Sequence, residues 1–268
     1  MFFSTRQAIF SSLPGKARIG AAMAGAALLL MAGQAHAGTV IATFLGADPA
    51  GGLVQRSIVS GPGAPQLNST QDPERFLMNA TGGSELFRII GNGIGAQFYA
   101  FCIEPRQFID NSSITYDLVP LSSGTTNIGG MGATKADQIT ELFGRYAPNL
   151  NAPMTSLKAT ALQIAIWEIV RETPGDALDV TSGNIYFTTP ESPSGAIALA
   201  QTYVQSIDGT GPRAIGLMAL DNGIFGDPST SAGTQDLLVQ TPEPTTLAVL
   251  GFGLTALIGA RRTRRTRA

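Results

Sequence analysis

Histidine and cysteine are almost absent from this chain of 268 residues, which contains one of each, His36 and Cys102. His36 lies in an N-terminal segment that we expect to be cleaved off, so the exported protein has no histidine. This excludes the nucleophile–histidine pairs of many cysteine and serine hydrolases, and it excludes histidine-based zinc sites. A pair of carboxylates that cleaves glycosidic bonds is not excluded, because that chemistry needs no histidine.

The first 37 residues have the order of a secretory signal peptide. Basic residues come first, an apolar run of small residues and leucines follows, and Ala35-His36-Ala37 supplies an A-x-A cleavage pattern. We therefore expect residues 1–37 to be a signal peptide and the mature chain to begin at Gly38.

The last 28 residues, 241–268, also form an ordered series of signals. Pro242-Glu243-Pro244 precedes an apolar stretch, residues 245–260. An arginine cluster then ends the chain: Arg261, Arg262, Arg264, Arg265 and Arg267. Sixteen helical residues span about 24 Å, less than the roughly 30 Å of bilayer hydrocarbon, so we expect a short transmembrane helix whose arginines reach the cytoplasmic side.

This tail resembles the PEP-CTERM sorting signal of Gram-negative bacteria. The resemblance implies that the chain is held transiently in the inner membrane, processed by an exosortase and released to the cell surface or the extracellular matrix. An ordinary C-terminal membrane anchor is the alternative interpretation.

The segment between the two signals is acidic. Three of the 17 basic residues lie in the first segment and five in the tail, which leaves nine, whereas 18 of the 19 acidic residues remain. A net charge near −9 disfavours nucleic acid and anionic lipid as partners. The roughly 200 residues of this segment are enough for one packed core.

Periodicity predicts a mainly β domain over residues 38–240, an antiparallel sandwich or barrel with a helical insertion at about 131–207. Short apolar or alternating runs predict eight strands, near residues 39–45, 53–59, 86–91, 96–104, 114–120, 184–188, 214–220 and 235–240. Helical spacing predicts three helices, from about 134 to 146, 153 to 172 and 195 to 207. Asp221-Asn222-Gly223, with Asp227, is compatible with a calcium loop, but turns use the same residues. We expect a turn there, and neither a metal nor a cofactor.

Cys102 and Gln163 are the two unusual residues of the predicted domain. An unpaired cysteine is prone to oxidation in an exported protein, although a buried inert thiol is the simpler interpretation. Gln163 lies in the apolar helical stretch "ALQIAIWEIV", residues 161–170, one turn before Trp167. A buried carboxamide without partners costs a few kcal/mol, so it must be hydrogen-bonded or chemically altered. Attack of Cys102 on the Gln163 carboxamide, with loss of ammonia, would produce an internal thioester and remove both anomalies.

Two short motifs resemble those of the thioester domains of bacterial surface adhesins. Phe101-Cys102-Ile103 matches the cysteine motif, and the stretch from Leu162 to Trp167 matches the glutamine motif. The resemblance implies a thioester that acylates an amine or hydroxyl on a target, so that the protein attaches covalently and is used once rather than acting as a turnover enzyme. The implied target is an extracellular polymer or a surface protein, as for an adhesin of a biofilm or exopolysaccharide matrix.

Neighbouring residues have both reactive and ordinary interpretations. Trp167 could shield the bond from hydrolysis or simply pack in the core. Glu104 could move a proton, but we expect a solvated carboxylate beside Pro105. For the whole chain, the alternatives are a non-reactive structural matrix protein and a carboxylate-dependent glycan hydrolase.

Overall fold

The computed structural model describes residues 38–49, 54–58, 67–71, 73–85, 97–107, 109, 111–125, 130–223 and 235–241. The expected signal peptide, the C-terminal apolar stretch and the strand expected at 86–91 lie outside these residues. The chain divides into two units, Met1–His36 and Ala37–Ala268, and the described residues all belong to the second. No helix in the described part of the chain is long and apolar enough to cross a membrane.

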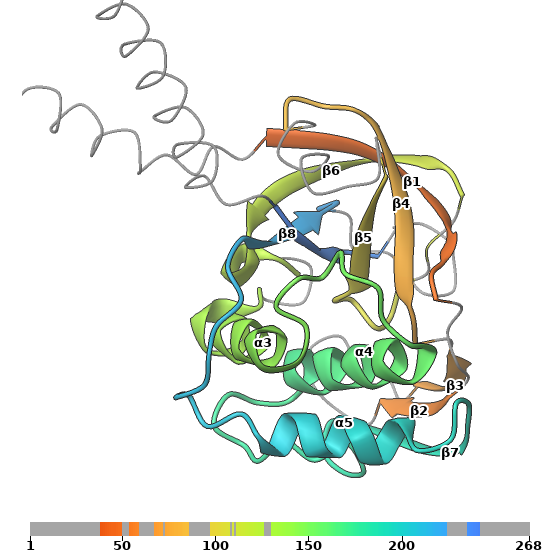
Figure 1. Ribbon diagram of the computed structural model, residues 1–268, viewed down its shortest axis with the longest axis vertical. Helices are drawn as coiled ribbons and strands as arrows, with labels where there is room; N and C mark the ends of the chain where they lie inside the picture. Colours follow the sequence, from red (N-terminus) through yellow and green to blue (C-terminus); the bar gives the residue numbers. More distant parts are fainter. Residues whose placement is uncertain are drawn as a thin grey trace, which may run out of the picture. The chain divides into compact units, whose positions relative to one another are not determined.

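Six strands close into an antiparallel barrel in the order β1-β4-β5-β9-β8-β6 (Figure 1). The strands are β1 (Gly38–Ala47), β4 (Arg75–Gly82), β5 (Gln97–Cys102), β6 (Ser113–Pro120), β8 (Leu217–Asp221) and β9 (Leu237–Gln240). The prediction of a mainly β domain is therefore confirmed, and of the two predicted architectures the barrel is the one formed.

The alternation of buried and half-buried residues along the strands shows which residues face the interior of the barrel. In β1, Val40 and Ala42 are buried while their neighbours are half-buried, as a strand with one face on the core requires. In β4, Phe76, Met78 and Ala80 alternate inward in the same way. Strand β4 was not predicted, although this alternation is visible in its sequence.

A second sheet has three strands in the order β3-β2-β7. Its strands are β2 (Val54–Ile58), β3 (Leu67–Gln71) and β7 (Ile185–Glu191). The prediction of strands at 53–59 and 184–188 is confirmed, whereas β3 was not predicted. Arg56 of β2 is the register partner of Phe187 of β7, so these two side chains are neighbours across the sheet.

Three helices separate β6 from β8 along the chain: α3 (Gly132–Tyr146), α4 (Ser156–Arg171) and α5 (Ala196–Gln205). A short 3-10 helix, η1 (Leu121–Ser123), precedes them. Thr155 begins α4 by accepting a hydrogen bond from the Lys158 backbone N–H. Helix α4 contacts β4 and β5 of the barrel on one side, and β7 and α5 on another (Figure 1). Because it is covered on several sides, all of residues 159–171 are buried, which accounts for the apolar sequence of this helix.

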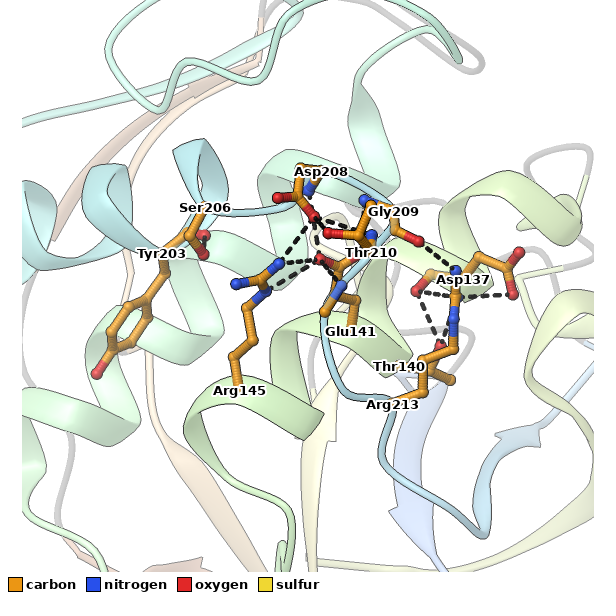
Figure 2. A network of polar contacts seen from close by, with 11 residues as sticks. Asp137, Thr140, Glu141, Arg145, Tyr203, Ser206, Asp208, Gly209, Thr210 and Arg213 are labelled. Carbon is orange, nitrogen blue, oxygen red and sulfur yellow. Dashed lines mark hydrogen bonds and ion pairs between the residues drawn. The ribbon is translucent and has the colours of Figure 1, made fainter.

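The segment that follows α5 is fastened to α3 by Glu141 (Figure 2). The Glu141 carboxylate accepts hydrogen bonds from the backbone N–H groups of Asp208, Gly209 and Gly211, and from the Arg145 guanidinium. Gly144 lies against the same segment, where a Cβ atom would come within 2.1 Å of the Pro212 carbonyl oxygen. We call residues 208–211 with Glu141 and Arg145 the α3 clasp.

Candidate functional site

Cys102 is the last residue of β5 and lies between the barrel and α4. It pairs with Leu237 of β9, and its backbone and side chain are wholly buried. Cys102 lies at the end of the barrel that α4 covers. Phe101, the preceding residue, packs edge-on against Phe143 of α3, with ring centroids 5.7 Å apart. The cysteine therefore has a fixed position at a strand–helix junction.

The Gln163 carboxamide is hydrogen-bonded to the backbone of Cys102 in both directions. The Cys102 N–H donates to Gln163 Oε1 over 2.9 Å, and Gln163 Nε2 donates to the Cys102 carbonyl oxygen over 2.7 Å. Gln163 is fully buried. The structure thus brings together the two residues that the sequence analysis singled out, and it supplies backbone partners for the buried amide.

The Cys102 thiol is protonated at neutral pH. Its Sγ donates to the Glu104 carbonyl oxygen at 3.2 Å. Burial raises the pKa of the thiol to about 12, and the negative charge of Glu104 adds to the rise. The Trp167 indole and the Arg56 guanidinium act in the opposite direction. The Trp167 indole N–H lies near enough to Cys102 Sγ to lower the pKa of the thiol. It forms no well-aligned hydrogen bond with an acceptor in the described residues.

Glu104 is buried, so the expectation of a solvated carboxylate was wrong. Arg56 and Arg171, from distant parts of the chain, and the neighbouring Arg106 act on its side chain, an environment that local alternation cannot reveal. Oε1 accepts from the Arg106 N–H at 3.1 Å, whereas Oε2 has no hydrogen-bond partner in the described part of the protein. Burial raises the pKa of Glu104, and the Arg106 N–H with the charges of Arg171, Arg106 and Arg56 opposes that rise incompletely.

Trp167 contacts two side chains of the three-stranded sheet. Its ring stacks on Phe187 with centroids 6.2 Å apart and planes 10° apart, and the Arg56 guanidinium carbon lies 5.3 Å from the ring centroid. The indole is 3% exposed. Arg56 and Arg171 were not identified from the sequence, because only the fold brings their segments to Glu104. Arg106 lies two residues after Glu104 and was not singled out either.

The arrangement is suited to polarise the Gln163 carbonyl group. The Cys102 N–H points at Oε1, the oxygen on which negative charge would develop if a nucleophile added to the side-chain carbon. The same cysteine carries a thiol with a raised pKa, and the Glu104 carboxyl group, whose pKa is also raised, interacts electrostatically with that thiol.

The proposed turn at residues 221–223 is formed. Asp221 Oδ1 accepts from the Gly223 N–H at 2.7 Å, and Gly223 has a φ of +65°, which favours glycine. Asp227 lies outside the described residues. Within the described ranges, no group of three or more Asp, Glu, His or Cys side chains is placed to hold a metal ion.

Comparison with known proteins identifies the C-terminal tail. Residues 240–265 match the model of the PEP-CTERM protein-sorting motif. The match includes Pro242, Glu243, Pro244, Arg261 and Arg262, so the resemblance noted for the tail is confirmed. The PEP-CTERM motif marks the chain as an exported protein that is targeted to an exosortase by way of a membrane-anchored intermediate. No curated protein and no solved structure matches the chain.

Proposed function

We propose that this exported protein attaches covalently to an amine- or hydroxyl-bearing target through an internal thioester between Cys102 Sγ and the Gln163 side-chain carbonyl carbon. The observation that carries the proposal is the reciprocal pair of hydrogen bonds, 2.9 and 2.7 Å, between the Gln163 carboxamide and the Cys102 backbone. In this role the protein is a single-use binding module of the cell surface or matrix, not a turnover enzyme.

Formation of the thioester replaces the nitrogen on the Gln163 side-chain carbon with the Cys102 sulphur. The Cys102 sulphur adds to the Gln163 side-chain carbon while the Cys102 N–H stabilises the negative charge on Oε1. The C–N bond then breaks and ammonia leaves. A thiol with a pKa of about 12 must lose its proton during this step. Glu104 takes that proton and returns it to the departing nitrogen, because burial makes its carboxylate a stronger base than an exposed one.

The completed thioester reacts in the same way with an external nucleophile. An amine or hydroxyl adds to the carbonyl carbon, the Cys102 thiolate leaves, and the proton of the nucleophile passes to the sulphur. The product is an amide or an ester at Gln163. This reaction is easier than amide exchange, because a thiolate is a far better leaving group than an amine.

Charge and location restrict the target. The segment between the two signals carries a net charge near −9. Acidic polymers are therefore repelled at low salt, which favours neutral or basic partners. The PEP-CTERM motif directs the protein out of the cytoplasm, so we propose an extracellular polysaccharide or surface protein as the covalent partner.

The non-reactive alternative rests on the same hydrogen bonds. Both polar ends of the Gln163 carboxamide already have backbone partners, which is all that an ordinary buried glutamine needs. In that case Cys102 is an inert core thiol and the protein is a structural component of the matrix.

Capture of a small labelled alkylamine distinguishes these functions. Freshly isolated protein should incorporate the amine at Gln163 and release one titratable thiol, whereas Cys102→Ala and Gln163→Glu should incorporate none. Gln163→Glu retains the size and one acceptor oxygen of the side chain, so loss of capture there does not require unfolding.

Gln240→Ala is the matched control. The Gln240 carboxamide also joins distant backbone groups, accepting from the Leu150 N–H and donating to the carbonyl oxygens of Pro148 and Ile215. This variant should capture the amine like the wild type. Absence of label in freshly isolated wild-type protein, or label that persists in Cys102→Ala, would contradict the proposal.

A further inference from the structure

The candidate thioester site is closed to a target polymer. Cys102 and Gln163 both have no exposed surface, and Trp167 beside them is 3% exposed. A side chain or sugar of another polymer cannot reach a carbonyl carbon in that position. If the protein acts as proposed above, attachment requires a part of the structure to move, and the contacts around Trp167 indicate which part.

Trp167 connects the site to the three-stranded sheet. Arg56 and Phe187 face each other across β2 and β7, and both contact the indole, at 5.3 Å and 6.2 Å. Neither residue belongs to the barrel or to α4. The sheet β3-β2-β7 therefore holds a side chain of α4 that lies close to the Cys102 sulphur.

Arg56 also fastens this sheet to the segment after Cys102. Its Nη1 donates to the carbonyl oxygen of Pro105, the residue that follows Glu104. Arg56 is 1% exposed, and burial lowers its pKa to about 10, which leaves it charged at neutral pH. A buried guanidinium is costly unless several groups stabilise it, and here the Pro105 carbonyl oxygen and the Trp167 ring do so together.

We propose that the sheet β3-β2-β7 is a cover over the Cys102–Gln163 site and that Arg56 is the latch that holds it closed. With Arg56 in place, the indole shields the carbonyl carbon from water and from chance nucleophiles. Release of the Arg56 contacts to Trp167 and Pro105 frees the indole and admits the target. Arg56 thus controls access and does not take part in the bond exchange.

Thiol labelling tests the latch without relying on a thioester. In a Gln163→Glu background the Cys102 thiol is free, and its alkylation rate by iodoacetamide reports how often the cover opens. Adding Arg56→Met should raise that rate about tenfold, since a desolvated cation–π contact biases an equilibrium by at least this factor. Arg56→Lys keeps the charge near the ring and should raise it less.

Arg75→Met, made in the same background, is the matched control. Arg75 is an equally buried arginine that lies 3.8 Å from the Tyr99 ring centroid and donates to the carbonyl oxygens of Asp48, Leu150 and Ala152. It makes the same kinds of contact away from Trp167, so its loss should leave the alkylation rate within about twofold of the background protein.

The same variants should change the reaction rates of the completed bond. In the otherwise wild-type protein, Arg56→Met should form the thioester more slowly, because the Arg56 charge lowers the pKa of the Cys102 thiol, and the completed bond should then add methylamine, and hydrolyse, about tenfold faster. Phe187→Leu removes the aromatic ring that stacks on the indole and should act in the same direction, which keeps the test available if Arg56→Met does not fold.

Two results would overturn the latch: unchanged alkylation in Arg56→Met and Phe187→Leu, or an equal increase in Arg75→Met. Failure of the thioester to form is a separate result. The wild-type protein would then show no loss of ammonia, while the alkylation rates in the Gln163→Glu background would still report on the cover.

Discussion

Glu141 and Glu104 are both buried glutamates, but their surroundings are opposite. The two oxygens of Glu141 accept from Arg145 and from three backbone N–H groups of the α3 clasp. Burial alone would raise its pKa, yet these hydrogen bonds outweigh burial and the pKa is lowered. Glu104 has one hydrogen-bonded oxygen, an Oε2 with no partner in the described residues, and a raised pKa.

The difference separates a structural carboxylate from a candidate functional one. The fold stabilises the charged form of Glu141, whose role is to hold the segment after α5 on α3 (Figure 2). At Glu104 the fold disfavours the charged form and places the group beside a buried thiol. Raised carboxyl pKa values at positions next to reactive groups are typical of functional sites.

The largest effect on stability is expected at the clasp. Glu141→Ala leaves three backbone N–H groups without their acceptor and removes one of the two carboxylate partners of Arg145, so the free energy of unfolding should fall by about 2–3 kcal/mol. Asp137→Ala removes only the exposed ion pair with Arg213 and should cost less than about 0.5 kcal/mol. Urea titration of both variants measures this, and amine capture should remain. Equal losses in the two variants would remove the distinction between the clasp and the surface.

The clasp and two other buried carboxyl groups, Asp236 and Glu168, should also respond oppositely to pH. Hydrogen bonds from Thr210 lower the pKa of Asp208 to about 2, so the stability contributed by the clasp is present above pH 4 and is lost as the pH falls toward 2. Burial raises the pKa of Asp236 to about 7 and that of Glu168 to about 8. These groups favour the folded state below pH 4 to 5, and that contribution is lost as the pH rises to 7–8.

The free energy of unfolding should therefore be greatest at mildly acidic pH. Each carboxyl group with a raised pKa lowers the free energy of unfolding by at most about 1.4 kcal/mol per pH unit as the pH rises. Asp236→Asn should flatten the decline between pH 5 and 7 while leaving the acid side unchanged. Urea titrations at several pH values test this, and a stability maximum above pH 8 would contradict it.

Of the two buried glutamates, Glu104 is expected to have the smaller effect on stability. Because the fold disfavours its charge, Glu104→Gln should change the free energy of unfolding by less than about 1 kcal/mol. The same variant should slow formation of the thioester, because no carboxylate then accepts the Cys102 proton. Time-resolved mass measurement after refolding follows that step. A variant that loses ammonia as fast as the wild type would show that Glu104 has no part in it.

The sequence predicted those parts of the fold that have a local signal. Strands β1, β5 and β6 alternate or carry apolar runs, and α4 has long helical spacing between a capping threonine and a proline stop. Strand β3, Leu-Asn-Ser-Thr-Gln, has a mostly polar sequence and is defined by its pairing with β2, so no local pattern indicates it. Strand order in the barrel is likewise a property of long-range pairing.

The candidate site was predictable only in part. The rarity of cysteine and the polarity of Gln163 within an apolar helix singled out the pair, and the structure places them in hydrogen-bond contact. The burial of Glu104 and the contacts of Arg56 depend on segments about 50 residues or more apart in the sequence. No spacing or periodicity within one segment contains that information.

Intact mass is the most direct test of the central claim. The folded protein, isolated rapidly at neutral pH, should be lighter than its own sequence by one ammonia, and Cys102→Ala should show its full sequence mass. Treatment with methylamine should then add one amine at Gln163 and expose one thiol. A wild-type protein that is folded, has its full sequence mass and retains an unmodified Gln163 carboxamide would contradict the account.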